Sequence, residues 1–142
     1  MGSIPGAVLP SAGGSRPPVL VIDDDDDLRE LVCRVLQHAG HPVFEASSGR
    51  EALALLHEGA AVELLVTDLK MEHGSGGWFL AQLAYELPRL LPRTLVMSGD
   101  PHGAGTAHVM ARWRCPLLAK PFTPSQLLAA LTALEGPPDG QA

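Results

Sequence analysis

Short apolar runs alternate along the chain with longer stretches in which apolar residues recur every three or four positions. The short runs predict five strands, at residues 19–22, 42–46, 62–67, 94–97 and 116–119. The helical spacing predicts a helix after each strand, at about 28–39, 48–58, 79–87, 104–113 and 124–134. Gly40 is expected to close the first helix, and Thr123 with Gln126 is expected to form a capping box at the start of the last. Most of the strands are continuously apolar, which is typical of strands covered by helices on both faces. The pattern therefore predicts a parallel, doubly wound α/β sandwich.

The two ends of the chain lack this alternation. Residues 1–18 and 136–142 are rich in glycine and proline, a composition typical of flexible segments. We expect one folded domain at 19–135, with a flexible N-terminal tail or linker at 1–18 and a flexible C-terminal tail at 136–142. A chain of 142 residues, 46% of them hydrophobic, is sufficient for one domain with its own core.

Charge and composition limit the classes of function. The chain has 16 acidic and 10 basic residues, a net charge of −6, and its basic residues form no stripe. We therefore expect no direct nucleic-acid partner, because such binding depends on cations set against phosphates. No apolar run reaches the roughly 18 residues of a membrane span, and the N-terminus does not resemble a signal peptide. We expect a cytoplasmic protein without membrane insertion, with Cys33 and Cys115 as reduced thiols.

Five consecutive aspartates follow the first predicted strand. Like charges at this density repel one another, so the run requires an explanation. Asp26 and Asp27 are expected to begin the first helix, where the helix dipole favours a negative charge by about 0.3–1 kcal/mol. Asp27 is the expected cap of that helix. Asp23 and Asp24, directly after the strand, are not explained in this way.

Polar residues stand at the carboxyl ends of four predicted strands. They are Asp23 and Asp24 after the first strand, Asp68 after the third, Ser98 after the fourth and Lys120 after the fifth. Parallel strands bring these ends to one edge of the sheet, where the site of such folds lies. Clustered carboxylates can share Mg²⁺, and a carboxylate beside the ion can attack phosphorus. With a lysine and a hydroxyl to meet phosphoryl oxygens, this edge of the sheet predicts phosphoryl transfer.

The segments that carry these residues resemble the motifs of a known family. VLVIDDDDDLRELV, LLVTDLKM, LVMSGD and LLAKPF are similar to the motifs of the response-regulator receiver domain, over residues 19–134. The spacings from Asp24 to Asp68, Ser98 and Lys120 agree with those of the family as well. The resemblance implies a flavodoxin-like sandwich of five strand–helix units. It also implies a signalling phosphoacceptor, not an enzyme beyond self-catalysed phosphotransfer and autodephosphorylation.

The resemblance assigns roles to individual residues. It implies that Asp68 accepts a phosphoryl group from the phosphohistidine of a sensor histidine kinase or phosphotransfer protein. Ser98 and Lys120 would then contact the phosphoryl oxygens, and the bond from Lys120 to Pro121 would be cis. The implied ligands of Mg²⁺, direct or through water, are Asp23, Asp24, Asp68 and the backbone carbonyl of Lys70. The output would be a downstream protein target, contacted by a stand-alone protein or by a receiver from a hybrid kinase.

Several positions depart from the family pattern. Leu117 occupies the place of a tyrosine or phenylalanine whose ring usually moves inward on activation, so this chain has no ring at that position for the usual relay. The fourth helix is interrupted by glycine and proline, and ARWRC at 111–115 replaces a small turn. Trp113 and its flanking arginines form either a docking patch or a cap on the core. Glu72 replaces a frequent proline, and GSGG at 74–77 predicts a pliable loop.

Other classes of protein fit the residues to different degrees. A phosphorylation-independent interaction module on the same fold is the main alternative, favoured by Leu117. A haloacid dehalogenase phosphatase needs a second aspartate two residues after the nucleophile, where this chain has Lys70. An EF-hand beginning at Asp23 would have Leu28 and Arg34 at the positions that require Gly and Glu. The six histidines show no metal-binding pattern and are expected at the surface.

One charged pair near the predicted site allows two interpretations. Lys70 lies two residues after Asp68, and Asp100 lies two residues after Ser98. Their opposite charges allow a salt bridge across the mouth of the site. The alternative is that both side chains point into solvent, where such a pair contributes only about 0–1 kcal/mol.

Overall fold

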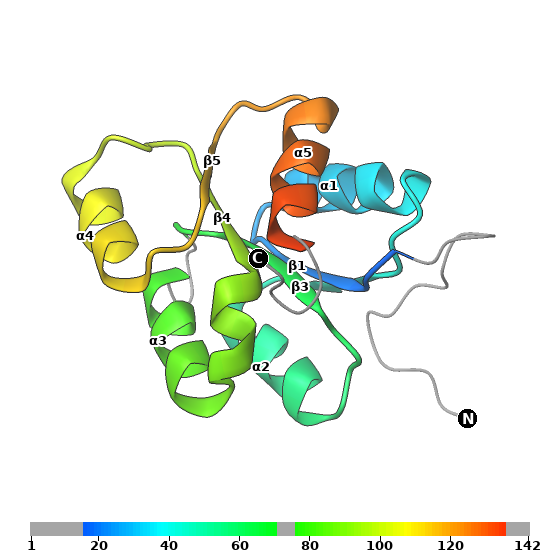
Figure 1. Ribbon diagram of the computed structural model, residues 1–142, viewed down its shortest axis with the longest axis horizontal. Coiled ribbons are helices and arrows are strands. Elements are labelled where there is room, and N and C mark those ends of the chain that lie inside the picture. Colours follow the sequence, from blue (N-terminus) through cyan, green and yellow to red (C-terminus); the bar gives the residue numbers. More distant parts are fainter. Residues whose placement is uncertain (1–15, 71–75, 136–142) are drawn as a thin grey trace.

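The computed structural model describes residues 16–70 and 76–135 (Figure 1). Five parallel strands form one sheet in the order β2-β1-β3-β4-β5. The strands are β1 (Val19–Ile22), β2 (Val43–Ala46), β3 (Leu64–Asp68), β4 (Thr94–Ser98) and β5 (Leu117–Ala119). The helices are α1 (Asp26–His38), α2 (Gly49–His57), α3 (Gly76–Glu86), the short 3₁₀ helix η1 (Pro88–Arg93), α4 (Ala104–Trp113) and α5 (Pro124–Glu135). This arrangement confirms the predicted parallel, doubly wound α/β fold.

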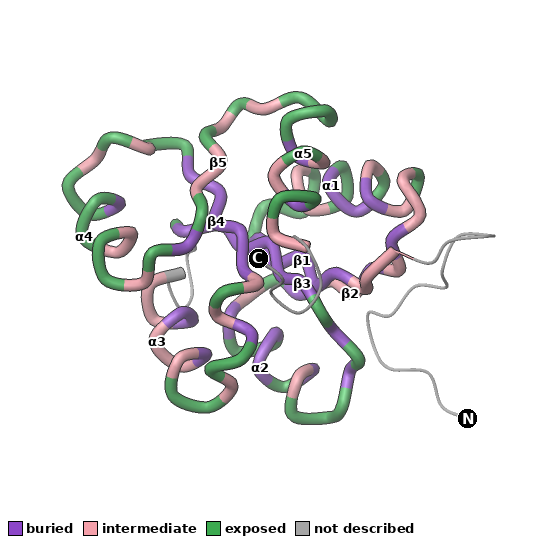
Figure 2. The backbone as a smooth tube through the Cα atoms, viewed as in Figure 1, coloured by how far each residue is buried: buried purple, intermediate pink, exposed green. Residues whose placement is uncertain are grey.

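The sheet is covered by helices on both faces. Figure 1 shows α1 and α5 on one side of the sheet and α2 and α3 on the other, with α4 beside α3. Alternate residues of β1 supply the two cores, as the period of a strand requires. Val19 and Val21 pack with α1 and α5, whereas Leu20 and Ile22 pack with α2 and α3. Figure 2 shows the strands as mostly buried and the outer faces of the helices as exposed.

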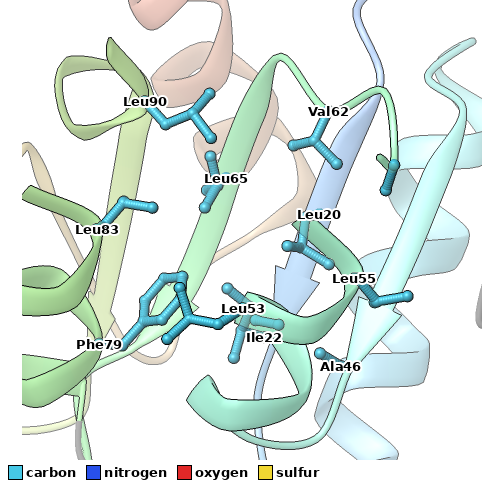
Figure 3. Packing of buried hydrophobic residues seen from close by; sticks show 12 residues of the cluster. Leu20, Ile22, Ala46, Leu53, Leu55, Val62, Leu65, Phe79, Leu83 and Leu90 are labelled. Carbon is cyan, nitrogen blue, oxygen red and sulfur yellow. The ribbon is translucent and has the colours of Figure 1, made fainter. Parts of the chain in front are cut away.

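The core under α2 and α3 contains the largest fully buried side chain, Phe79. Figure 3 shows its ring beside Ile22 and Leu53, with Leu65 and Leu83 farther along the same layer. The strands therefore have no freedom to shift relative to the helices without opening a cavity, which costs several kcal/mol for residues of this size. The carboxyl ends of the strands are held in place by this packing.

The structure confirms the predicted glycine after α1 and the predicted capping box at the start of α5. Gly40 follows α1 with a φ of 98°, a left-handed conformation that favours glycine. At α5, the Thr123 N–H donates to Gln126 at 2.8 Å, and the Gln126 N–H donates to the Thr123 hydroxyl at 3.1 Å. These two bonds form the predicted capping box.

Some boundaries and caps differ from the prediction. Asp25, not Asp27, caps α1, because its carboxylate accepts the N–H groups of Asp27 and Leu28 at 3.1 Å each. The third strand begins at Leu64, not at residue 62, because Pro18 O accepts the N–H groups of Glu63 and Leu64 at the entry to the strand. The 3₁₀ helix η1 was not predicted, since two prolines there break the helical spacing. Most of the predicted tails, Glu72 and most of the predicted GSGG loop lie outside the described residues.

The prediction that the histidines lie at the surface is wrong for His41. His41 is fully buried, and its Nδ1 lies 2.8 Å from Pro17 O, which ties the segment before β1 to the start of β2. The surface expectation failed because a histidine next to a strand gives no sequence signal of its burial. Cys33 and Cys115 are both free and buried. In the part of the chain that the structure describes, no helix has the length and apolar character needed to cross a bilayer.

The turn from α4 into β5 carries the one positive φ of a residue other than glycine within the described ranges. Arg114 has a φ of 59° and a ψ of 30°, and its N–H donates to Met110 O at 2.8 Å to close the helix. This left-handed conformation costs a residue with a Cβ about 1–2 kcal/mol. The ARWRC departure from a small turn therefore places an arginine where glycine would be free of strain.

Replacing Arg114 by glycine is expected to raise the free energy of unfolding by about 1 kcal/mol, because glycine enters this conformation without the cost of a Cβ. Chemical denaturation measures the change. The matched control is Arg114→Ala, which removes the same side chain, keeps the Cβ and is expected to gain nothing. Equal free energies of unfolding for Arg114→Gly and Arg114→Ala would contradict the proposed backbone strain at this position.

Candidate functional site

The predicted polar residues lie together at the carboxyl edge of the sheet. Asp68 and Ser98 are the last residues of β3 and β4, Asp23 follows β1, and Lys120 follows β5. The chain runs from β1 to β2 on one side and from β2 across to β3 on the other, so the switch in strand order lies between β1 and β3. Asp23 and Asp68 flank this switch, which is the binding position expected of open α/β sheets.

Three carboxylates form a compact cluster at this switch. One oxygen from each of Asp23, Asp24 and Asp68 can be chosen such that all lie within 4.8 Å of one another. Asp23 and Asp68 are buried, with 1% and 4% of their surface exposed, whereas Asp24 is exposed. Oδ1 of Asp23 accepts the Asp25 N–H at 3.0 Å, but its buried Oδ2 has no hydrogen-bond partner among the described residues. A carboxylate oxygen left in this state fits a hard cation such as Mg²⁺.

Lys120 supplies positive charge to the cluster. Its Nζ lies 2.8 Å from Asp68 Oδ1 and 3.8 Å from Asp23 Oδ2. The bond from Lys120 to Pro121 is cis, as the family resemblance implies. The Lys120 N–H also donates to Ser98 O at 2.8 Å, which continues the pairing of β4 with the segment after β5. One lysine therefore serves two buried carboxylates and is itself held by the sheet.

Burial changes the acidity of both buried carboxyl groups. Burial raises the pKa of Asp23 to about 6, and the negative charges of Asp68 and Asp24 add to the rise, while the Asp25 N–H and Lys120 oppose it. The pKa of Asp68 is also raised, again mainly by burial, although its hydrogen bond to Lys120 opposes the change. The cluster therefore carries negative charge at neutral pH at an energetic cost, which an additional cation would offset.

Arg29 supports the loop between β1 and α1, a role that sequence reasoning missed. Its guanidinium donates to Asp23 O at 2.8 Å and forms ion pairs with Asp26 at 2.8 Å and Glu45 at 3.0 Å. The spacing of three residues from Asp26 was the available signal, because residues three apart share a helix face. The other partner, Glu45, lies on β2 and could not be found from local spacing.

Ser98 faces the loop that leads into α4. Its Oγ accepts the Asp100 N–H at 3.0 Å and lies 3.5 Å from the hydroxyl of Thr106, which is also buried. Thr106 in turn donates to Asp100 O at 2.8 Å. Thr106 was not among the predicted site residues, because a threonine in an irregular helix carries no distinctive pattern.

Lys70 and Asp100 lie at the mouth of the site but form no salt bridge with each other in the described structure. Both line a pocket of about 300 Å³, together with Thr106 and Val109. The Asp100 carboxylate lies over Gly103 at the beginning of α4, so closely that a Cβ at Gly103 would meet it. The structure therefore favours the interpretation without a lid. The role of the Lys70 carbonyl as a metal ligand stays a prediction.

The departures near β5 are partly buried. Leu117 and Trp113 both pack against the small core formed by Leu69, Leu80, Val96 and Cys115. The Arg112 guanidinium lies 4.6 Å from the centre of the Trp113 ring. Trp113 therefore packs on the core, as the second interpretation requires. A docking role for Trp113 and its arginines stays a prediction.

Asp23→Asn is expected to raise the melting temperature at pH 7 in EDTA, and to have little effect at pH 4. In the folded protein the pKa of Asp23 is about 6, above its ordinary value of 3.8. The stability associated with the neutral carboxyl group is therefore present below pH 3.8 and is lost as the pH rises through 6. Asparagine stays neutral throughout, so the gain should grow across this range. Thermal unfolding from pH 4 to 8 measures it.

The control for this experiment is Asp27→Asn, which removes an exposed charge from the same acidic run. It is expected to give no comparable gain at pH 7. A difference between Asp23→Asn and the wild type that does not change with pH would contradict the assigned cause.

Comparison with known proteins agrees with this geometry. Residues 19–132 match the model of the response regulator receiver domain. The chain is 34% identical over 95 residues to the sensor kinase CckA of Brucella abortus (strain 2308), a match that covers 66% of this chain and 10% of that protein. The chain therefore spans about a tenth of the length of that relative.

Solved structures with the same fold are also similar in sequence. A response regulator receiver domain protein from Clostridium thermocellum is 27% identical, with a TM-score of 0.72, over 84% of this chain and 94% of that one. The chemotaxis response regulator CheY4 of Vibrio cholerae is 26% identical, with a TM-score of 0.73, over 84% of this chain and 99% of that one. The chain belongs to the response regulator receiver domain family.

Proposed function

We propose that this receiver domain accepts a phosphoryl group on Asp68 from the phosphohistidine of a sensor histidine kinase or phosphotransfer protein. The observation that carries the proposal is the 2.8 Å contact between Lys120 and Asp68, beside the carboxylates of Asp23 and Asp24. A buried carboxylate with a fixed ammonium group on one side and metal-binding oxygens on the other has the parts that phosphoryl transfer requires.

The proposed reaction is a displacement at phosphorus. An oxygen of the ionised Asp68 carboxylate forms the new P–O bond while the P–N bond of phosphohistidine breaks, and the electron pair returns to the imidazole nitrogen. Lys120 neutralises charge on the phosphoryl oxygens, and the Ser98 hydroxyl donates to one of them. Water later hydrolyses the phosphoaspartate and regenerates the Asp68 carboxylate. In this proposal the domain catalyses its own phosphotransfer and dephosphorylation and no other reaction.

The proposed metal is Mg²⁺, held by the carboxylates of Asp23, Asp24 and Asp68 and by the backbone carbonyl of Lys70, directly or through water. When bound, Mg²⁺ supplies positive charge next to the phosphoryl oxygens and relieves the repulsion within the acidic cluster. The buried Oδ2 of Asp23, which accepts no hydrogen bond within the described residues, supports this assignment. The family relationship supports it as well, since the ligand positions lie in the matched range.

We propose that the phosphorylated domain signals by binding a downstream protein. The similarity to part of a sensor kinase supports an origin in a hybrid kinase, although a stand-alone receiver would use the same site. The proposed unit is residues 19–135, acting in the cytoplasm where histidine kinases donate phosphoryl groups. The acidic character of the chain, with its net charge of −6, supports protein partners over nucleic acid.

A second candidate function is an interaction module that signals without phosphate. Leu117 favours it, because this partly buried side chain has no ring to move inward when a phosphoryl group is added. The complete set of acidic residues, serine and lysine favours the phosphoacceptor. The two candidates differ in whether Asp68 is labelled and in whether labelling changes partner binding.

Incubation with acetyl phosphate and Mg²⁺ is expected to add the mass of one phosphoryl group to the wild type. Asp68→Asn is expected to abolish the gain, because the amide is not a nucleophile toward phosphorus. The control is Asp27→Asn, which removes an exposed carboxylate of the acidic run and should be labelled like the wild type. Intact-mass spectrometry measures all three proteins. Labelling of Asp68→Asn would place the phosphoacceptor elsewhere.

Mg²⁺ is expected to stabilise the unphosphorylated protein, by about 2.7 kcal/mol at 100 times its dissociation constant. Asp24→Ala should lose most of this metal-dependent shift in melting temperature, and it should melt higher than the wild type in EDTA because one of three repelling charges is gone. Melting curves with and without Mg²⁺ measure both effects. A full metal-dependent shift in Asp24→Ala would exclude Asp24 as a ligand.

A further inference from the structure

A short chain of hydrogen bonds connects the proposed phosphorylation site with α4. The Ser98 Oγ accepts the Asp100 N–H at 3.0 Å, and Asp100 O accepts the Thr106 hydroxyl at 2.8 Å. The two hydroxyl oxygens, of Ser98 and Thr106, lie 3.5 Å apart. Ser98 is therefore joined to the first turn of α4 both through the backbone N–H and C=O of Asp100 and across this direct contact.

The protons in this arrangement can be assigned. Each hydroxyl has one proton, and the Thr106 proton is committed to Asp100 O at 2.8 Å. At the 3.5 Å contact the Ser98 hydroxyl must therefore be the donor and Thr106 the acceptor. If Ser98 donates to a phosphoryl oxygen on Asp68, it can no longer donate to Thr106. Phosphorylation and the Ser98–Thr106 contact thus compete for one proton.

The beginning of α4 is attached mainly through Asp100 and Thr106. The Gly103 N–H donates to Asp100 O at 3.1 Å, the same oxygen that accepts the Thr106 hydroxyl. The N-cap of α4 is Gly103, which offers no side-chain cap, and Gly105 follows within the first turn. Within α4, which the structure describes in full, Thr106 is the one buried residue. Figure 2 shows the rest of this helix as exposed or half-buried. The last turns rest on the core through Val109, Met110 and Trp113, whereas Thr106 is the buried side chain of the first turn.

We propose that Thr106 is a positioning residue that couples the Ser98 hydroxyl to the first turn of α4, so that phosphorylation of Asp68 loosens that turn. This proposal rests on the proposed phosphoacceptor function. It gives the domain a route to its surface that needs no aromatic ring at Leu117. Phosphorylation would break the contact between the Ser98 and Thr106 hydroxyls. The first turn of α4, which has no side-chain cap, would then become less ordered.

Linkage makes the proposal distinguishable from a purely structural role for Thr106. Breaking the Ser98–Thr106 contact costs free energy when a phosphoryl group binds. A variant that already lacks the contact does not have that cost, so it must bind the phosphoryl group more tightly, by the factor that corresponds to the lost contact. Thr106→Val keeps the shape of the side chain and removes the hydroxyl. It frees Ser98 to donate to the phosphoryl oxygen. A variant that merely damaged the site would bind more weakly.

The experiment uses beryllium trifluoride with Mg²⁺, which mimics a phosphoryl group on a carboxylate. Amide hydrogen exchange is measured in peptides covering residues 104–113, with and without the mimic. In the wild type the mimic is expected to speed exchange in the first turn about twofold to threefold, because the contact that it breaks is a long, weak hydrogen bond of 3.5 Å. Thr106→Val should exchange faster without the mimic and show no further increase. It should also bind the mimic about twofold to threefold more tightly, because it no longer has the Ser98 contact to break.

The matched control is Thr106→Ser, which keeps the hydroxyl and is expected to behave like the wild type in both measurements. Thr106→Ala provides a second variant without the hydroxyl, which should agree with Thr106→Val. Unchanged exchange in the wild type, or a wild-type response in Thr106→Val, would overturn the coupling. Weaker binding of the mimic by Thr106→Val would do the same.

The proposed function itself is checked in parallel, by labelling of the wild type with acetyl phosphate. A wild type that is labelled at Asp68 but shows no change in α4 would overturn the coupling and leave the phosphoacceptor intact. A wild type that is not labelled and does not respond to the mimic would overturn both. Asp68→Asn, which lacks the acceptor carboxylate, must give no response to the mimic in either case.

Discussion

The repulsion among three carboxylates at the switch in strand order is the constraint on which the rest of the site depends. Asp23 and Asp68 are held there by buried strands whose side chains fill the two cores, so the cluster cannot spread apart without cost to the packing. Lys120 offsets part of the repulsion by its ion pair with Asp68. The Arg29 guanidinium holds the loop after β1 by donating to Asp23 O. An additional cation at this cluster would offset the repulsion that remains.

The same constraint explains why the site is sensitive to charge. Burial makes ionisation of Asp23 and Asp68 costly, and a hydrogen bond from Lys120 offsets only part of that cost. Any group that adds or removes charge at this edge changes the balance by more than it would at the surface, because the surroundings are poorly hydrated. A phosphoryl group on Asp68 would be such a group, and Ser98 is the neighbour with a proton to give.

Most of the departures from the family pattern lie on the side of α4 and β5. Leu117 and Trp113 fill the small core there, and Arg114 closes α4 in a left-handed conformation. The first turn of α4 lacks a side-chain cap and contacts the site through Thr106. The fold thus combines a rigid edge, where charge is concentrated, with a weakly held helix beside it.

The sequence by itself determined the five strands, the five α-helices, the parallel fold and the residues at the strand ends, because strand and helix periods and the position after a strand are local properties. It also located the capping box at Thr123. It did not determine that Asp25 caps α1, that His41 is buried, that Arg29 reaches Glu45 or that Thr106 meets Ser98. Those facts depend on which side chains the loops bring together and on the directions their rotamers take, and only the tertiary packing decides both.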